Sequence, residues 1–266
     1  MKQLLLFLFS FFCLENISAQ SASMFGMGNV STTLLDVDAV YGNQAGLAFV
    51  DQPLVSLNAI QQFGISEIGN YSLAAAIPTA LGSFGFMLDY YGIEAYNEQS
   101  VGISYARRLL KNLSIGAQFN YQNVSIPFYG NQSNFTFELG LFSKIMDKLF
   151  MGVHISNPVR ADKITEVEEL PTVFGMGLLY AASENLTVRL EVEKDLDYEA
   201  NVKLGIQYQI IEMLSLRVGA NSAPATATFG LGILALKNIH FDIGASYHHL
   251  LGFSPAGGLR FDFNRK

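Results

Sequence analysis

Hydrophobic and polar residues alternate along most of this chain with a period of two. In one clear run, Leu113, Ile115, Ala117, Phe119 and Tyr121 alternate with polar or small residues. Successive side chains of a β-strand point to opposite faces, so such a run has one apolar face and one polar face. The runs lack the three- and four-residue spacing of apolar positions that an amphipathic helix needs. The pattern therefore predicts β-strands.

Fourteen stretches show this alternation, with short turns and longer connections between them. The predicted strands are residues 54–62, 68–77, 82–92, 98–107, 112–124, 133–145, 149–156, 172–182, 185–194, 200–210, 213–221, 226–235, 238–249 and 255–264. Short turns are expected near Thr79, Leu110, Asp147, Glu184, Glu212 and Lys237, and longer connections notably at 125–132 and 157–171. Alternating short and long connections are typical of an up-and-down antiparallel transmembrane β-barrel. An even number of strands puts both termini of the barrel on the side of the short turns.

Prolines and glycines refine this picture. All seven prolines are expected at strand ends or in connections, because proline cannot donate to a central ladder. A soluble β-sandwich also alternates, but glycine on a solvated strand face weakens the strand, whereas inside a narrow barrel it admits another backbone. Twelve glycines lie on the polar phase and so predict a crowded lumen: Gly85, Gly102, Gly116, Gly140, Gly152, Gly175, Gly177, Gly205, Gly219, Gly230, Gly232 and Gly244.

Composition agrees with a membrane barrel. The chain has 266 residues, of which 50% are hydrophobic and 15% charged, and strand charges fall mostly on the glycine phase. Arg or Lys on a lipid-facing position would cost about 2–4 kcal/mol near the bilayer midplane. The net charge of −7 comes with no basic patch, so nothing suggests nucleic-acid binding.

The N-terminus indicates export. Lys2 precedes the apolar stretch 4–14, and small residues precede Gln20, so residues 1–19 are expected to be a cleaved signal peptide. A buried N-terminal strand or helix is the alternative. Cys13 is the only cysteine and would leave with the signal. The expected location is the outer membrane of a Gram-negative cell.

Residues 20–52 do not alternate and are too few for a domain. They contain apolar residues and glycine hinges. Because apolar residues need burial, we expect this segment to plug the lumen of a barrel formed by residues 53–266. The alternative is a flexible periplasmic tail.

The segment resembles the N-terminal signature of the PorV/PorQ family of Bacteroidota outer-membrane proteins, relatives of the FadL-type fatty-acid transporters. The family pattern is Gly-Met-Gly, an acidic segment and Asn-Pro-Ala-Gly-Leu, with Gln44 here in place of the proline. The matching plug-motif residues are Gly26, Gly28, Asn43, Ala45, Gly46 and Leu47, with Asp36 and Asp38 in the acidic segment. The chain end resembles the outer-membrane assembly signal, with Gly258, Phe261 and Phe263 in its places.

Strand charges of the lumen phase form the main polar constellation. They are Glu191, Lys203, Arg217, Asp242, Arg260 and Asp262. We expect opposite charges on neighbouring strands to pair as a structural layer that neutralises buried charge; a polar constriction that filters solutes is the alternative. His240 and Asp242 share this phase, and a hydrogen-bonded histidine is expected there rather than a general base, because no nucleophile signature accompanies it.

No catalytic, metal-binding or cofactor-binding motif is present in the sequence, so a non-enzymatic, monomeric barrel in contact with outer-membrane lipid is expected. Two functions remain open. The resemblance implies an accessory or structural part in type IX secretion or surface attachment, through contacts with secretion-system proteins. The alternative is a FadL-like passive route for a hydrophobic small molecule, which needs an apolar pocket leading to a gap in the wall.

Overall fold

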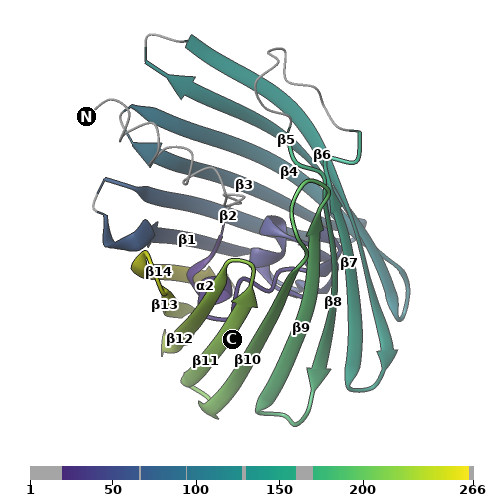
Figure 1. Ribbon diagram of the computed structural model, residues 1–266. Coiled ribbons are helices and arrows are strands. Elements are labelled where there is room, and N and C mark those ends of the chain that lie inside the picture. Colours follow the sequence, from purple (N-terminus) through teal and green to yellow (C-terminus); the bar gives the residue numbers. More distant parts are fainter. Residues whose placement is uncertain (1–19, 66, 94, 128–129, 160–169, 264–266) are drawn as a thin grey trace.

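Fourteen antiparallel strands close into a barrel in which each strand pairs with its neighbours in sequence and β1 pairs with β14 (Figure 1). The computed structural model describes residues 20–65, 67–93, 95–127, 130–159 and 170–263. The expected signal peptide, with Cys13, lies outside the described residues. The predicted fold, an all-β transmembrane-type barrel of fourteen strands, is confirmed.

The strand bounds follow the alternation closely. They are β1 Leu54–Gln61, β2 Gly69–Thr79, β3 Gly82–Ile93, β4 Tyr96–Leu110, β5 Leu113–Ile126, β6 Gly130–Met146, β7 Leu149–Ser156, β8 Val173–Ala181, β9 Leu186–Asp195, β10 Asn201–Ile211, β11 Leu214–Ser222, β12 Ala225–Leu236, β13 Ile239–His248 and β14 Gly252–Asp262. Short helices occur outside the strands: α2 Ala22–Phe25, η1 Val37–Tyr41, η2 Gln44–Phe49 and η3 Gln62–Gly64.

Two local predictions were wrong. Residues 125–132 were expected to form a longer connection, but β5 runs to Ile126 and β6 starts at Gly130, since these strands pair up to their ends. Pro255 was expected at a strand end but is the fourth residue of β14. The ladder between β1 and β14 reaches only to the pair Ile60–Ala256, so Pro255 stands beyond it, where β1 gives way to η3.

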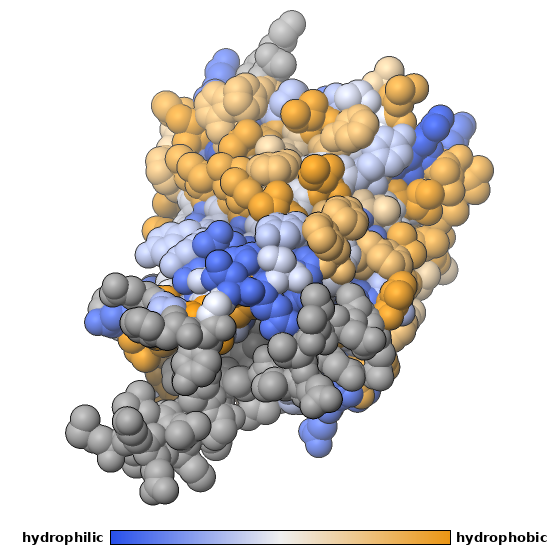
Figure 2. Space-filling model, turned by 90° about the horizontal axis from the view of Figure 1, so that it is seen from above, coloured by the Kyte–Doolittle hydropathy of each residue, from blue (hydrophilic) through white to orange (hydrophobic). Residues whose placement is uncertain are grey.

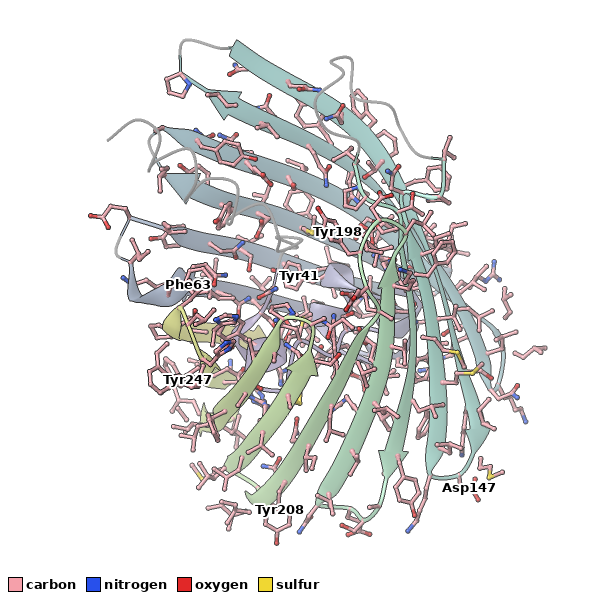
Figure 3. All side chains as sticks on the ribbon, viewed as in Figure 1. Tyr41, Phe63, Asp147, Tyr198, Tyr208 and Tyr247 are labelled. Atoms are coloured by element: carbon pink, nitrogen blue, oxygen red, sulfur yellow. The ribbon has the colours of Figure 1, made fainter. Side chains whose placement is uncertain are left out.

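The two ends of the barrel differ. At one end the turns are short, and Leu54 of β1 pairs with Asp262 of β14, so both barrel termini lie there. Figure 3 shows Asp147 and Tyr208 toward this end and Phe63 and Tyr247 toward the other. The connections of the second end range from the tight β11–β12 turn to the 157–172 segment, part of which lies outside the described residues.

The wall has an apolar outside and a largely polar inside. Large apolar side chains such as Ile103, Phe119, Phe135 and Phe229 are more than half exposed on the outer face. Seen from above, apolar residues cover the outer parts of the molecule and polar residues gather in the middle (Figure 2). Arg and Lys avoid such a lipid-facing surface because of their cost in hydrocarbon.

Among the described residues, no helix is long and apolar enough to cross a membrane.

Candidate functional site: the filled lumen and a groove in the wall

Residues 20–52, here called the plug, lie inside the barrel. Most side chains of residues 21–47 are buried, and Val37, Val40 and Leu47 have no exposed surface. These apolar residues pack with Ala74, Met87 and other inward side chains of β1–β4. The wall and the plug therefore share one hydrophobic core.

Inward glycines of the wall let the plug approach closely. A Cβ atom on Gly152 would lie 1.9 Å from Thr32 O, and one on Gly219 would lie 2.3 Å from Gly28 N. A Cβ atom would also lie 3.1 Å or less from a backbone or side-chain atom of the plug at Gly85, Gly116, Gly140, Gly175, Gly177, Gly205, Gly230, Gly244 and Gly258. We call these eleven residues the glycine belt. The belt follows the plug around the lumen, so a side chain at most of these positions would displace it.

The plug-motif glycines are needed for close approach. A Cβ on Gly26 would lie 2.8 Å from Gly230 Cα, and one on Gly46 would lie 1.9 Å from Leu34 O. Gly28 has a φ of +68°, a left-handed conformation that favours glycine. These contacts account for three glycines of the motif by geometry.

Asn43 ties the plug to the wall. Its Nδ2 donates to Thr32 O and to Leu141 O of β6, both at 2.9 Å, and its Oδ1 accepts from Ala45 N and so caps η2. Ala45 and Leu47 are fully buried beside it. Gln44, where the resembled family has proline, donates through Nε2 to Glu138 of β6 at 2.7 Å.

Glu191 of β9 is a second anchor. It is 1% exposed and accepts hydrogen bonds from Ser31 N, Thr32 N and Thr32 Oγ1 at 2.7–2.8 Å. Lys203 of β10 lies 3.4 Å from Glu191 and 2.7 Å from Glu193. A buried carboxylate with a cation and three donors is satisfied, and two of the residues that satisfy it come from the plug.

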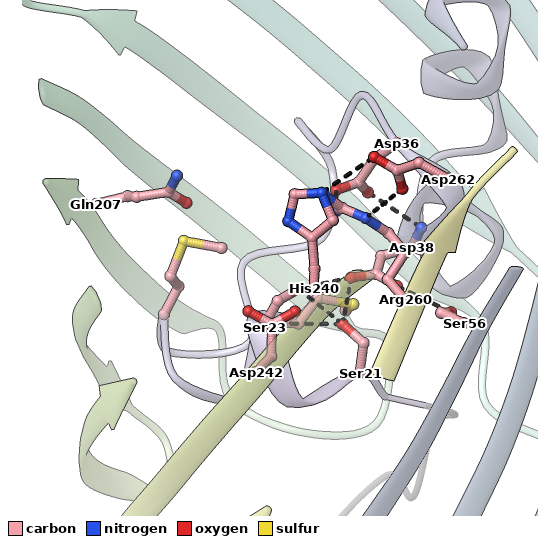
Figure 4. A network of polar contacts seen from close by, with 12 residues as sticks. Ser21, Ser23, Asp36, Asp38, Ser56, Gln207, His240, Asp242, Arg260 and Asp262 are labelled. Carbon is pink, nitrogen blue, oxygen red and sulfur yellow. Dashed lines mark hydrogen bonds and ion pairs between the residues drawn. The ribbon is translucent and has the colours of Figure 1, made fainter. Parts of the chain in front are cut away.

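The remaining predicted charges form a network across β11, β13, β14 and the plug (Figure 4). Arg217 pairs with Asp242 two strands away rather than with an adjacent strand. Arg260 binds both Asp262 and plug residue Asp36, at 3.2 and 3.1 Å. His240 of β13 lies 3.0 Å from Asp262 of β14, so the carboxylate that it meets belongs to the neighbouring strand.

Sequence reasoning missed the part that the plug plays in this network. Asp38 of η1 accepts hydrogen bonds from Ser21 and Ser23 of the plug and from Ser56 of β1. Burial, with the charge of Asp36 second, raises the pKa of Asp38 to about 6. The sequence showed that the plug carries an acidic segment, but the alternation of the strands could not show that Arg260 would pair with Asp36 of that segment.

The assembly-signal residues lie in and beside β14. Gly258 faces inward against Asn58 and Ala22, and the rings of Phe261 and Phe263 meet edge to face at 4.6 Å. Phe263 N donates to Pro53 O at 2.9 Å, which closes the barrel seam at its short-turn end.

The outer wall carries an apolar groove of about 710 Å³ across β14, β1, β2, β3 and β4. Its floor is shallow where Ala59 pairs with Gly257, and a Cβ on Gly257 would meet no atom within 4 Å. Leu57, Leu259 and Tyr71 are among its outward-facing lining residues. On the inner face of the same two strands, Ile60 and Ala256 pack with plug residues Ala22 and Phe25.

In the described part of the chain, no three His, Cys, Asp or Glu residues are grouped to hold a metal ion.

Solved structures share this fold. The toluene transporter TbuX of Ralstonia pickettii is 11% identical, with a TM-score of 0.72 and coverage of 94% of this chain and 100% of that chain. The toluene transporter TodX of Pseudomonas putida is 12% identical, with a TM-score of 0.71 and coverage of 93% and 97%. A Pseudomonas aeruginosa FadL homologue is 12% identical, with a TM-score of 0.64 and coverage of 91% and 97%.

No protein-family model and no curated protein matches the sequence. The expected relation to FadL-like barrels therefore holds at the level of fold, whereas none of the comparisons supports the narrower resemblance to PorV/PorQ. The architecture of the chain is that of the FadL-like outer-membrane barrels.

Proposed function

We propose that the protein is a passive outer-membrane channel for small hydrophobic molecules. The supporting observation is that the apolar groove outside the wall and the apolar cluster inside it lie on the same segments of β1 and β14. Ala59 and Gly257 face the groove, and the next residues, Ile60 and Ala256, face the cluster. An apolar solute dissolved in the membrane would meet little polar surface on this route.

The seam of the barrel offers the place of passage. The ladder between β1 and β14 ends at Ile60–Ala256, and η3 covers the wall above it. A hydrogen bond from Phe63 N to Ser254 Oγ, 2.9 Å long, joins η3 to β14 there. Phe63 has a φ of 53°, an uncommon conformation for an aromatic residue. Displacement of η3 would open the wall beside the apolar cluster without breaking the strand ladder.

The similar structures support the class of solute. TbuX and TodX are described as toluene transporters. Because they share only the fold with this chain, the solute itself is identified here by chemistry, as an apolar molecule small enough to enter a groove of about 710 Å³.

A protein-contact role in type IX secretion is the second candidate. The plug and its ion pairs fill much of the lumen, which favours a barrel that acts through its outer surface and connections. The seam and the groove have no use in that role, so we place it second.

Uptake by intact cells tests the proposal. A deletion strain would be complemented with wild type, with Gly257→Leu, which fills the groove at a position with free space, or with Ala220→Leu as an outward-facing control on β11. We expect wild type and Ala220→Leu to restore uptake of labelled toluene and Gly257→Leu to lose most of it. Secretion of type IX cargo is measured in parallel. Unchanged toluene uptake in the deletion strain, with lost secretion, would replace the channel by the accessory role.

A further inference from the structure

The inward carboxylate of Asp89 stands apart from the ion pairs described above. Asp89 lies on β3, on the longer-connection side of the glycine at Gly85. Asp242 and Glu191, by contrast, each meet a cation of the wall, Arg217 and Lys203 respectively. Within the described residues, Asp89 forms no ion pair.

The surroundings of Asp89 are rich in hydrogen-bond acceptors. One carboxylate oxygen accepts from Asn70 Nδ2 at 3.3 Å, and the other is buried without a partner among the described residues. Asn70 is 2% exposed, and its own Oδ1 likewise has no partner within the described part of the chain. The backbone oxygen of Gln20 accepts from Ser72, the cross-strand neighbour of Asp89, and the Oε1 of Gln20 is a third buried oxygen without a partner among those residues.

An aromatic ring and a second acid complete the patch. Tyr91 is the cross-strand neighbour of Asn70, faces inward and is 8% exposed. Glu98 pairs with Tyr91 from β4 and adds negative charge. A buried acceptor without a donor is unfavourable, and more so when it is charged. The group that fits this patch is therefore a cation with several N–H donors.

We propose that this patch binds the ammonium group of a small organic amine. A primary ammonium has three N–H donors for the oxygens of Asp89, Asn70 and Gln20, and an aromatic face such as that of Tyr91 attracts a cation. A divalent metal ion fits less well, because no three His, Cys, Asp or Glu residues are grouped here among the described residues and a calcium ion takes six to eight oxygen ligands. Asp89 is only partly buried, so the site is reachable from the lumen.

Calorimetric titration of the detergent-solubilised full barrel tests this proposal, with benzylammonium chloride as the probe and benzyl alcohol as its neutral counterpart. We expect saturable binding of benzylammonium at pH 7, no binding of benzyl alcohol, and at least tenfold weaker benzylammonium binding by Asp89→Asn. Glu193→Gln removes the same charge elsewhere in the lumen, beside Lys203, and should keep wild-type binding.

Several results would overturn it. They are the absence of saturable benzylammonium binding by wild type, equal loss in Glu193→Gln and Asp89→Asn, or displacement of the probe by stoichiometric calcium chloride. The first would remove the site, the second would reduce it to the net charge of the lumen, and the third would make it a metal site. None of these results bears on toluene uptake, so this proposal stands or falls independently of the proposed function.

Discussion

Substitution of Gly152 by alanine should displace the plug. The new Cβ would lie 1.9 Å from Thr32 O, whereas ordinary contacts begin at 3.4 Å, so the two must separate by 3.4 − 1.9 = 1.5 Å. Two hydrogen bonds join Thr32 to Glu191, 2.7 and 2.8 Å long, and the shift would break one of them. Overpacking costs about 1–3 kcal/mol and a lost hydrogen bond to a charged group about 1.5–3 kcal/mol, together roughly 2.5–6 kcal/mol.

Gly257→Ala is the matched control. Gly257 also lies within a strand, but its Cβ would meet nothing within 4 Å. Loss of chain freedom in the unfolded state should leave this variant unchanged or more stable by about 0.4–1 kcal/mol. Urea unfolding in lipid vesicles, followed by far-UV circular dichroism, gives both free energies. If Gly152→Ala unfolds at the same urea concentration as Gly257→Ala, the plug is not seated against the belt.

Further predictions concern buried charge and the lipid face. Glu191→Gln should cost about 3–5 kcal/mol, because it breaks a buried ion pair, whereas the more exposed Glu193→Gln should cost about 1 kcal/mol or less; urea unfolding midpoints of the two variants check this. Burial raises the folded pKa of Asp38 to about 6, above its ordinary value of 3.8, so ionisation of Asp38 destabilises the fold. The contribution of Asp38 to stability is therefore fully present below pH 3.8, is lost between pH 3.8 and 6, and does not change above pH 6. At about 1.4 kcal/mol per pKa unit, the fall is on the order of 3 kcal/mol, and it should be missing from the pH–stability profile of Asp38→Asn. Ile103→Arg should cost about 2–4 kcal/mol by exposing a cation to hydrocarbon. If Ile103→Arg and wild type have the same free energy of unfolding by urea in lipid vesicles, residue 103 does not face lipid.

The sequence predicted the barrel well because strand periodicity is a local property. Each residue of an alternating run faces in or out according to its neighbours, and the fourteen runs needed only to be paired in order. The position of Pro255 could not be predicted in this way, because it depends on where β1, far earlier in the chain, stops pairing with β14.

The site was harder to predict because its contacts are not local. Glu191 and Thr32 are 159 residues apart, and Arg260 and Asp36 are 224 apart. No local sequence pattern predicts hydrogen bonds over such separations. Adjacent glycines also differ in role: Gly258 faces the plug and Gly257 faces the groove. The residue type alone could not show that a side chain at Gly258 would meet the plug, whereas one at Gly257 would enter open space.

A disulfide between plug and wall tests the central claim, that the plug fills the lumen against the glycine belt. An ideal Cβ on Gly177 lies 3.3 Å from Thr32 Cβ, close to the separation of about 3.5–4.5 Å that a disulfide requires. With Cys13 replaced by serine, the pair Thr32→Cys and Gly177→Cys should oxidise in the folded barrel and resist extraction of the plug. The pair Thr32→Cys and Gly257→Cys, with the second residue on the outer face, should stay reduced. If both cysteine pairs oxidise to the same extent, or if neither pair oxidises, the plug does not lie against the glycine belt.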